Sequence, residues 1–195
     1  GGQNALIADS SALPEQLVKD ALASAFTSAG QRCSAARVLF VQADIADKVI
    51  GMLAGAMAEL RVGDPALLST DVGPVIDTDA LKLLEDHAAK MAGSAKLIAE
   101  AKTGDDVAHG TFFAPRAWEL QSLSQLTREN FGPALHVIRW QADQLDAVID
   151  AINATGYGLT LGIHSRIDDT IERIAARARV GNVYVNRNQI GAVVG

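Results

Sequence analysis

The chain has little of several features, and each shortage excludes a class of protein. One cysteine, Cys33, among 195 residues rules out a disulfide within the chain and is typical of a reducing compartment, so we expect a cytoplasmic protein. No stretch approaches the roughly 18 uninterrupted apolar residues of a membrane-spanning helix. Lysine and arginine are scattered and the formal net charge is −6, which argues against a nucleic-acid partner and against a basic membrane patch.

The start of the sequence lacks the basic and apolar segments of a secretory signal. Gly1-Gly2-Gln3-Asn4 has neither, and it resembles the interior of a longer chain. Internal repeats and low-complexity tracts are absent as well. What is present is an ordinary globular mixture, 49% hydrophobic and 21% charged, in a length that allows one domain with its own core.

Short apolar runs alternate with longer amphipathic segments along the whole chain. This pattern predicts an α/β fold, a mostly parallel sheet with helices on both faces. Ligands of such sheets bind at the carboxyl ends of the strands, so we expect the chemistry in the loops there. The predicted strands are 5–8, 37–42, 96–99, 112–118, 134–140, 159–164 and 182–185, and the predicted helices are 14–26, 44–60, 79–91, 144–153 and one that starts near 169.

Three local signals refine this pattern. Pro115 cannot donate a backbone hydrogen bond, which favours an edge position for its strand. Asp169, with Glu172 three residues later, has the spacing of a capping box at the start of the last helix. Gly73-Pro74 predicts that the segment between the second and third helices is a loop.

Cys33 is the candidate nucleophile. It follows a glycine that ends a helical pattern, precedes an apolar strand and stands between Arg32 and Ser34, a setting that suits a thiol that meets a substrate. The neighbouring guanidinium favours the reactive thiolate, whereas the negative end of the preceding helix opposes it. Free cysteines are also among the most buried residue types. The residues alone leave two interpretations open, a catalytic thiol and a structural one.

Four motifs resemble those of aldehyde dehydrogenases, in the family's order and along the whole chain. Gly30-Gln31-Arg32-Cys33-Ser34 is similar to the cysteine motif, and Gly1-Gly2-Gln3-Asn4 resembles the sequence that follows the family's glutamate. Glu129-Asn130-Phe131-Gly132-Pro133 is similar to the Glu-x-Phe-Gly-Pro motif, and 181–187 to the late Gly-x-Val-x-Val-Asn segment. The ending, 188–195, resembles the pyrroline-5-carboxylate dehydrogenase branch, in the form found within bacterial bifunctional proline-utilisation enzymes.

The resemblance implies a mechanism and the residues that carry it. The Cys33 thiolate attacks the aldehyde to give a thiohemiacetal, hydride passes to NAD, and water releases the acid from the resulting thioester. The backbone N–H of Cys33 helps to hold the oxyanion. Glu129 hydrogen-bonds the nicotinamide ribose, and Phe131 packs near the nicotinamide ring. Three residues are implied to grip the carboxylate of glutamate semialdehyde through a hydroxyl and backbone N–H groups, namely Ser34, Gly191 and Ala192.

Each of these residues also has a plainer interpretation. Glu129 alone is typical of a solvated loop carboxylate, Phe131 of simple packing, and Gly191 of a turn. The histidines, at 87, 109, 136 and 164, lack the spacing of metal ligands, so no metal site is expected. Two further functions stay open: an aldehyde dehydrogenase for another aldehyde, and a non-catalytic α/β module for binding or assembly.

Parts of the family's machinery are expected to lie outside these residues. The resemblance places the water-activating glutamate immediately before Gly1, and an asparagine that completes the oxyanion hole further upstream. The nucleotide-binding domain and the C-terminal oligomerisation segment are absent too, and FAD would belong to a separate domain of a bifunctional parent. We therefore expect 1–195 to be the catalytic domain of a homo-oligomeric parent, with the rest of that polypeptide and a small aldehyde as partners, and to be inactive in isolation.

Overall fold

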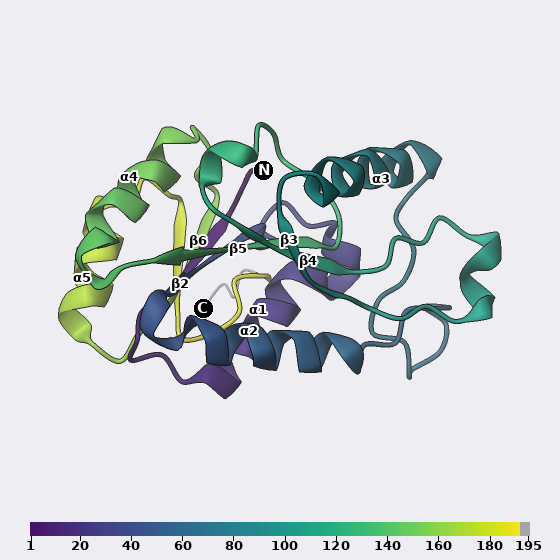
Figure 1. Cartoon of the computed structure of the whole chain (residues 1–195), viewed down its shortest axis with the longest axis horizontal. Coiled ribbons are helices and arrows are strands. Elements are labelled where there is room, and N and C mark those ends of the chain that lie inside the picture. Colours follow the sequence, from purple (N-terminus) through teal and green to yellow (C-terminus); the bar gives the residue numbers. More distant parts are fainter. Residues whose placement is uncertain (192–195) are drawn as a thin grey trace.

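The computed structural model describes residues 1–191, which form seven strands in one sheet at the centre of the molecule (Figure 1). The strands are β1 (Ala5–Ala8), β2 (Val38–Gln42), β3 (Lys96–Glu100), β4 (Arg116–Leu120), β5 (Ala134–Trp140), β6 (Thr160–His164) and β7 (Asn182–Val185). Their order is β3-β4-β5-β2-β1-β6-β7, and every neighbouring pair is parallel except β3 with β4. The mostly parallel α/β fold predicted from the sequence is confirmed.

The central strands carry the core. Every residue of β1, β2 and β6 is buried, and a strand covered on both faces reads as a continuous apolar run rather than an alternating one. The outer strands β3 and β7 have only half-buried and exposed side chains. Loops attached to β1, β2, β5 and β6 therefore start from the most buried part of the sheet.

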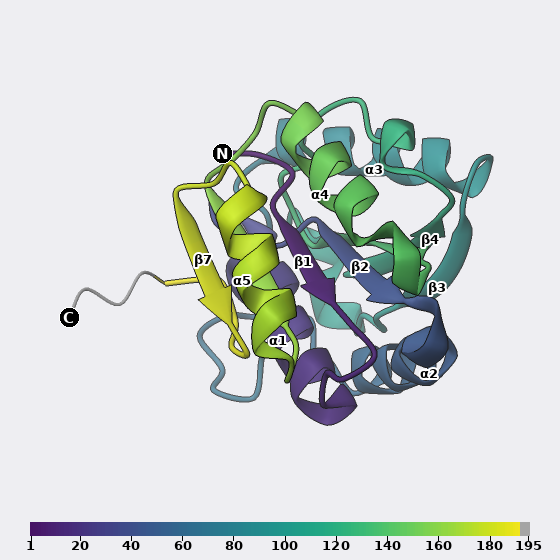
Figure 2. The same cartoon turned by 90° about the vertical axis from the view of Figure 1, so that its left-hand side faces the viewer.

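Helices cover both faces of the sheet (Figure 2). They are α1 (Pro14–Phe26), α2 (Ala43–Ala58), α3 (Thr78–Ala92), α4 (Leu145–Ala154) and α5 (Asp168–Arg177). α1 and α2 pack side by side on one face, and α3 and α4 lie on the other. Arg173 and Arg177 of α5 form ion pairs with Asp146 of α4, so these two helices are neighbours. None of the described helices combines the length and the apolarity that crossing a bilayer requires.

Three local predictions are wrong. The strand predicted at 112–118 begins only at Arg116 and runs to Leu120, because Pro115 has no N–H to donate to a ladder. β4 lies between β3 and β5, so the strand that follows Pro115 is an interior strand and not an edge. The proline is tolerated because it stands just before the strand and owes no ladder hydrogen bond. The last helix has no capping box, since it begins at Asp168 with Ile167 at the N-cap and no side-chain bond there. Asp169 and Glu172 consequently lie two positions too far into the helix to cap it.

Candidate active site

Four of the predicted site residues lie at the amino ends of the parallel strands. Cys33 and Ser34 belong to the loop before β2, and Glu129 and Phe131 belong to the loop before β5. Because β1, β2 and β5 are parallel, these loops meet at the edge where β1 starts, next to the N-terminus marked in Figure 2. These four residues therefore do not lie at the carboxyl ends, where the sheet type led us to expect the chemistry. The connection from α1 presents the cysteine before its strand begins, not after the strand ends.

An unusual backbone conformation precedes Cys33. After α1, three successive residues have left-handed φ angles: Ser28 at 57°, Ala29 at 53° and Gly30 at 65°. Residues with a Cβ are strained in this region, and such strain is concentrated at functional sites. The Cys33 side chain that follows is exposed. An exposed thiol fits the catalytic interpretation, and it does not fit a structural thiol that fills a core.

Gly30 packs directly on the loop that carries Glu129 and Phe131. A Cβ on Gly30 would lie 2.2 Å from the carbonyl oxygen of Gly132 and 2.7 Å from that of Ala25. Both distances are far inside van der Waals contact with backbone atoms. The glycine of the cysteine motif therefore allows the two loops to approach.

Asn4 holds the carbonyl groups that follow the thiol. Its Nδ2 donates to the carbonyl oxygens of Cys33 at 2.7 Å and Ala35 at 3.0 Å, and its Oδ1 accepts from the N–H of Thr160 at 3.2 Å. The Thr160 hydroxyl donates in turn to the carbonyl oxygen of Ser34 at 3.0 Å. Three consecutive carbonyls are thus bound to groups at the starts of β1 and β6.

Arg37 is a buried cation that joins the two loops. It is 1% exposed and stands just before β2. Its Nη1 donates to the carbonyl oxygen of Gly132 at 2.8 Å, its Nη2 donates to that of Arg32 at 3.4 Å, and its guanidinium lies over the Phe131 ring. Burial lowers the pKa of Arg37 to about 10, while the charge of Glu129 acts in the opposite direction. Arg37 therefore remains a cation near pH 7.

Glu129 has a carboxylate oxygen that no other described residue binds, and Phe131 has an aromatic surface that no other described residue covers. The Oε1 atom of Glu129 is buried and has no hydrogen-bond partner there. Phe131 is 45% exposed although it is a large apolar side chain. An unpaired buried carboxylate oxygen suits a hydroxyl donor, and exposed aromatic surface suits a flat ring. Through Arg37, both residues are tied to the cysteine loop.

The residues implied to grip a carboxylate are placed only in part. Ser34 is half-buried beside the thiol, and Gly191 is exposed with a φ of 75°, while Ala192 lies outside the described residues. Gln189 is buried and donates to the Thr160 hydroxyl at 3.3 Å, the same hydroxyl that donates to the carbonyl of Ser34. This chain of bonds brings the segment just before Gly191 against the cysteine loop.

A third segment is bound to the cysteine loop by Gln31. Its Oε1 accepts from the N–H of Ile76 at 2.8 Å, and its Nε2 donates to the carbonyl oxygen of Pro74 at 3.3 Å. Ile76 is 84% exposed. The predicted loop between α2 and α3 is confirmed, but no signal in the sequence connects it to this site.

Two histidines meet in the core behind the site. The Nε2 atoms of His87 and His136 are 2.8 Å apart, and Nδ1 of His136 lies 2.8 Å from the carbonyl oxygen of Arg37. A carbonyl only accepts, so His136 carries its proton on Nδ1 and His87 donates from Nε2. Burial lowers the pKa of His87 to about 4 and that of His136 to about 3. The pair is therefore neutral near pH 7 and supports the backbone of Arg37.

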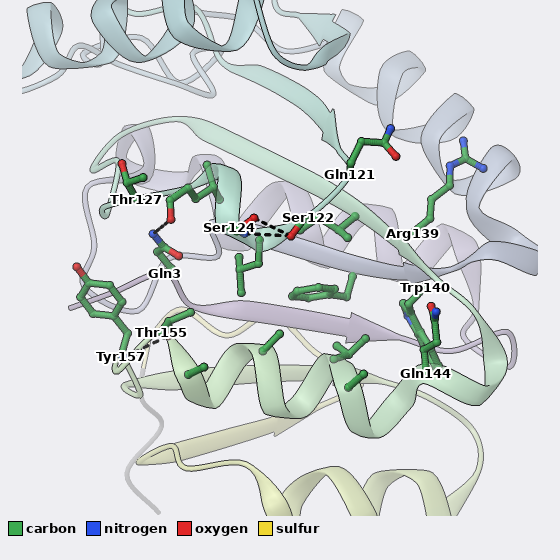
Figure 3. A pocket seen from close by; sticks show the side chains of 18 residues that line it. Gln3, Gln121, Ser122, Ser124, Thr127, Arg139, Trp140, Gln144, Thr155 and Tyr157 are labelled. Atoms are coloured by element: carbon green, nitrogen blue, oxygen red, sulfur yellow. Dashed lines mark hydrogen bonds between the residues drawn. The ribbon is translucent and has the colours of Figure 1, made fainter.

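A groove of about 690 Å³ lies between α4 and the short helix η3 (Leu123–Gln125) (Figure 3). Phe40 and Ile138 contribute to its apolar lining. Figure 3 shows Gln3 and Tyr157 at the amino end of the strands and Gln144 at the other end. None of the predicted catalytic or binding residues lines this groove. The groove is therefore separate from the predicted site residues.

Comparison with known proteins agrees with the four motifs. The model of the aldehyde dehydrogenase family matches residues 1–195. The chain belongs to the aldehyde dehydrogenase family. It is 54% identical over 200 residues to the bifunctional protein PutA of Escherichia coli K12, and 32% identical over 197 residues to the 1-pyrroline-5-carboxylate dehydrogenase of Geobacillus kaustophilus. A solved variant of proline utilization A from Bradyrhizobium japonicum is 55% identical, with a TM-score of 0.96.

These aldehyde dehydrogenase relatives are much longer than this chain. The whole chain is covered in each comparison, but only 15% of the E. coli PutA, 38% of the Geobacillus enzyme and 20% of the Bradyrhizobium protein are covered. The chain thus spans a small part of the bifunctional relatives and less than half of the dehydrogenase relative.

The sequence did not point to the residues whose side chains hydrogen-bond the backbone of the cysteine loop. Asn4 appeared in a motif but received no role, and Arg37 and Thr160 received none. One signal was available. Arg37 opens an otherwise apolar run, and a cation in a buried strand requires a partner. The roles of Asn4 and Thr160 depend on the pairing of β1 with β2 and with β6, which the sequence does not reveal.

Proposed function

We propose that residues 1–195 are the cysteine-bearing catalytic domain of an NAD-dependent dehydrogenase that oxidises glutamate semialdehyde, formed from pyrroline-5-carboxylate, to glutamate in proline catabolism. Family membership supports the reaction class. The substrate rests on the relatives, which are named as PutA and as 1-pyrroline-5-carboxylate dehydrogenase. The single observation that carries the proposal is the exposed Cys33 on a loop tied by Arg37 to Glu129 and Phe131.

In the proposed reaction, the Cys33 thiolate forms a bond to the aldehyde carbon, and the carbonyl electron pair moves onto oxygen. The backbone N–H of Cys33 donates to that oxyanion. The carbon then loses hydride and becomes a thioester, a two-electron oxidation. Water adds to the thioester, the acid leaves, and the thiol is restored.

The site residues fit the nicotinamide cofactor of this family. The unpaired Oε1 of Glu129 is available to accept a hydrogen bond from a ribose hydroxyl, and the exposed ring of Phe131 is available to pack beside the nicotinamide. Bound NAD supplies the hydride acceptor. In this proposal Glu129 and Phe131 orient that acceptor beside the thiol. Arg37, which contacts the Phe131 ring and the Gly132 carbonyl, keeps their loop in place.

We assign recognition of the substrate carboxylate to Ser34, Gly191 and Ala192. Ser34 lies beside the thiol, and the bonds of Gln189 and Thr160 bring the segment before Gly191 toward it. A hydroxyl and backbone N–H groups on a glycine-containing segment can satisfy a carboxylate without an opposing full charge. A substrate with a carboxylate is thereby favoured over a simple aldehyde.

The rest of the machinery belongs to the full-length protein in this proposal. The nucleotide-binding domain, the water-activating glutamate and the oligomerisation segment lie outside 1–195, and FAD would occupy a separate domain of a bifunctional parent. That parent would act as a cytoplasmic homo-oligomer. The competing functions are oxidation of a different aldehyde, which steady-state kinetics on several semialdehydes separates, and a non-catalytic module for binding or assembly.

The proposal is tested with Cys33→Ser and Cys33→Ala in the full-length protein. We expect both variants to lose aldehyde-dependent NADH formation by at least about a thousandfold, since removal of a nucleophile leaves only residual catalysis. NAD binding, measured by fluorescence titration, should stay at the native affinity. Activity retained in either variant would refute the nucleophile and favour the non-catalytic module.

A further inference from the structure

Each of the two peptide groups that flank Cys33 accepts a hydrogen bond from a buried side chain, that of Asn4 or that of Arg37. The peptide between Cys33 and Ser34 is held through its carbonyl oxygen by Nδ2 of Asn4 at 2.7 Å. Three of the four hydrogen-bonding positions of the Asn4 amide are engaged, both donors on carbonyls and one acceptor position on the Thr160 N–H. The amide orientation is thereby determined, because only its nitrogen can face two carbonyl oxygens.

The peptide between Arg32 and Cys33 is held from the other side. Its carbonyl oxygen, that of Arg32, accepts from the N–H of Ala35 at 3.1 Å and from Nη2 of Arg37 at 3.4 Å. In a planar trans peptide the C=O and the following N–H point in opposite directions. Drawing the Arg32 carbonyl toward Arg37 therefore turns the Cys33 N–H away from it. Among the described residues this N–H has no hydrogen-bond acceptor.

We propose that Asn4 and Arg37 are positioning residues that fix the orientation of both peptide groups at Cys33, and with them the thiol and the N–H that receives the oxyanion. The inference rests on the proposed role of Cys33. Asn4 stands immediately before β1 and Arg37 immediately before β2, and the Arg37 N–H donates to the Asn4 carbonyl at 2.8 Å. Side chains anchored at the starts of two buried, paired strands provide the rigid support that a precise site requires.

The residue types follow from the bonds. Asn4 must supply two donors and one acceptor on a short side chain, so aspartate would set a carboxylate against two carbonyl oxygens, and serine can donate to only one of them. Arg37 must reach two carbonyls, those of Gly132 and Arg32, with a fork of donors that lysine lacks. Neither side chain is assigned a contact with the aldehyde. Both act through the backbone of Cys33.

The test uses Asn4→Ser, Asn4→Asp and Arg37→Lys in the full-length protein. We expect kcat to fall by about 10- to 100-fold with little change in KM for the aldehyde, because a misplaced nucleophile and oxyanion donor weaken the chemical step more than ground-state binding. The alkylation rate of Cys33 by iodoacetamide, followed by mass spectrometry of its peptide, should change in the same variants. Asn4→Asp carries a risk of misfolding, so Asn4→Ser and Arg37→Lys are the deciding variants.

Asn153→Ala is the matched control. Its side chain also bridges backbone groups, donating to the Arg177 carbonyl and accepting from the Arg179 N–H, but it joins α4 to the segment after α5. We expect native kcat and native alkylation in this variant. The proposal is overturned if the deciding variants keep native kcat, if they lose no more than the control, or if neither folds, since the two residues would then hold the fold and not the thiol.

The outcomes separate this inference from the proposed function. If Cys33→Ala retains aldehyde oxidation, the nucleophile assignment fails whatever the other variants do. If Cys33→Ala is inactive while Asn4→Ser and Arg37→Lys have native kcat and alkylation rate, the nucleophile stands and the positioning role fails.

Discussion

Gly30 is the residue on which the approach of the two site loops most directly depends. We expect Gly30→Ala to lower the free energy of unfolding by about 2–4 kcal/mol, because its φ is 65° and its Cβ would overlap two backbone carbonyls. Urea unfolding of the 195-residue chain measures the change. Gly55→Ala is the control, because a Cβ there meets nothing within 4 Å inside α2. That substitution should stabilise by about 0.5–1 kcal/mol, and equal effects at the two positions would contradict the packing described.

The His87–His136 pair makes stability sensitive to acid. An unfolded histidine titrates near pH 6.5, whereas burial lowers the pKa of His87 to about 4 and that of His136 to about 3. The unfolded chain therefore binds more protons than the folded chain below pH 6.5. Stability is fully present above that pH and is lost as pH falls through it toward 4 and 3.

We expect the stability lost between pH 7 and pH 5 to be about 1–2 kcal/mol smaller in His87→Gln than in the native chain, since one buried titrating group is removed. A glutamine amide can still donate to Nε2 of His136. The measurement is the urea midpoint at the two pH values. His109 is exposed, so His109→Gln should follow the native chain. A native pH dependence in His87→Gln would count against the buried pair.

At the scale of elements, the start of α5 is a weak point that the sequence did not reveal. The expected capping box is absent, and the half-exposed apolar Ile167 occupies the N-cap with extended backbone angles. The N–H groups of residues 168–170 consequently lack a side-chain partner at that cap. The acidic residues of the first turn, Asp168 and Asp169, compensate in part through the helix dipole.

We expect Ile167→Ser to stabilise the chain by about 0.5–1 kcal/mol relative to Ile167→Ala, because only the hydroxyl can accept from the first turn. Thermal unfolding of the two variants measures the difference, and the comparison with alanine removes the effect of losing the isoleucine side chain. Equal stability would mean that the terminus is already satisfied by solvent.

At the scale of the whole molecule, the chain spans only part of the relatives that it resembles. We expect the 195-residue chain to form no NADH from glutamate semialdehyde and NAD, because the proposed water-activating glutamate and nucleotide-binding domain are not among its residues. We also expect iodoacetamide to alkylate Cys33 without denaturant, since the side chain is exposed. The full-length protein treated in the same way is the control. Turnover by the isolated chain, or a thiol that reacts only after denaturation, would contradict this account.

Most of the fold was predictable because its causes are local. The strands 134–140 and 182–185 were located to the residue, since each is a short run rich in β-branched and aromatic residues that begins directly after proline or glycine. The helices shifted by only one or two residues. The errors at Pro115 and at α5 concern which neighbour a strand acquires and where a helix end lies, and local sequence determines neither strongly.

The site was predictable in its residue types and not in its arrangement. Motifs pointed to Cys33, Glu129 and Phe131 as the proposed site residues, because covalent chemistry and cofactor contacts demand particular side chains. Their common position at the amino ends of the strands follows from a parallel order that brings β5 beside β2. Asn4 and Arg37 bind carbonyl groups 29 and 95 positions away in the sequence, so only the structure shows which loops these two residues hold.

The sequence by itself determined the alternation of strands and helices, the presence of a single thiol and the family to which the motifs belong. The tertiary structure decided that the thiol is exposed, which loops meet beside it, and which buried groups hold its two peptide planes. The physical reason is the range of the forces involved. Periodic burial and turn chemistry act over a few residues, whereas the orientation of Cys33 depends on hydrogen bonds that form only after β1, β2, β5 and β6 have assembled.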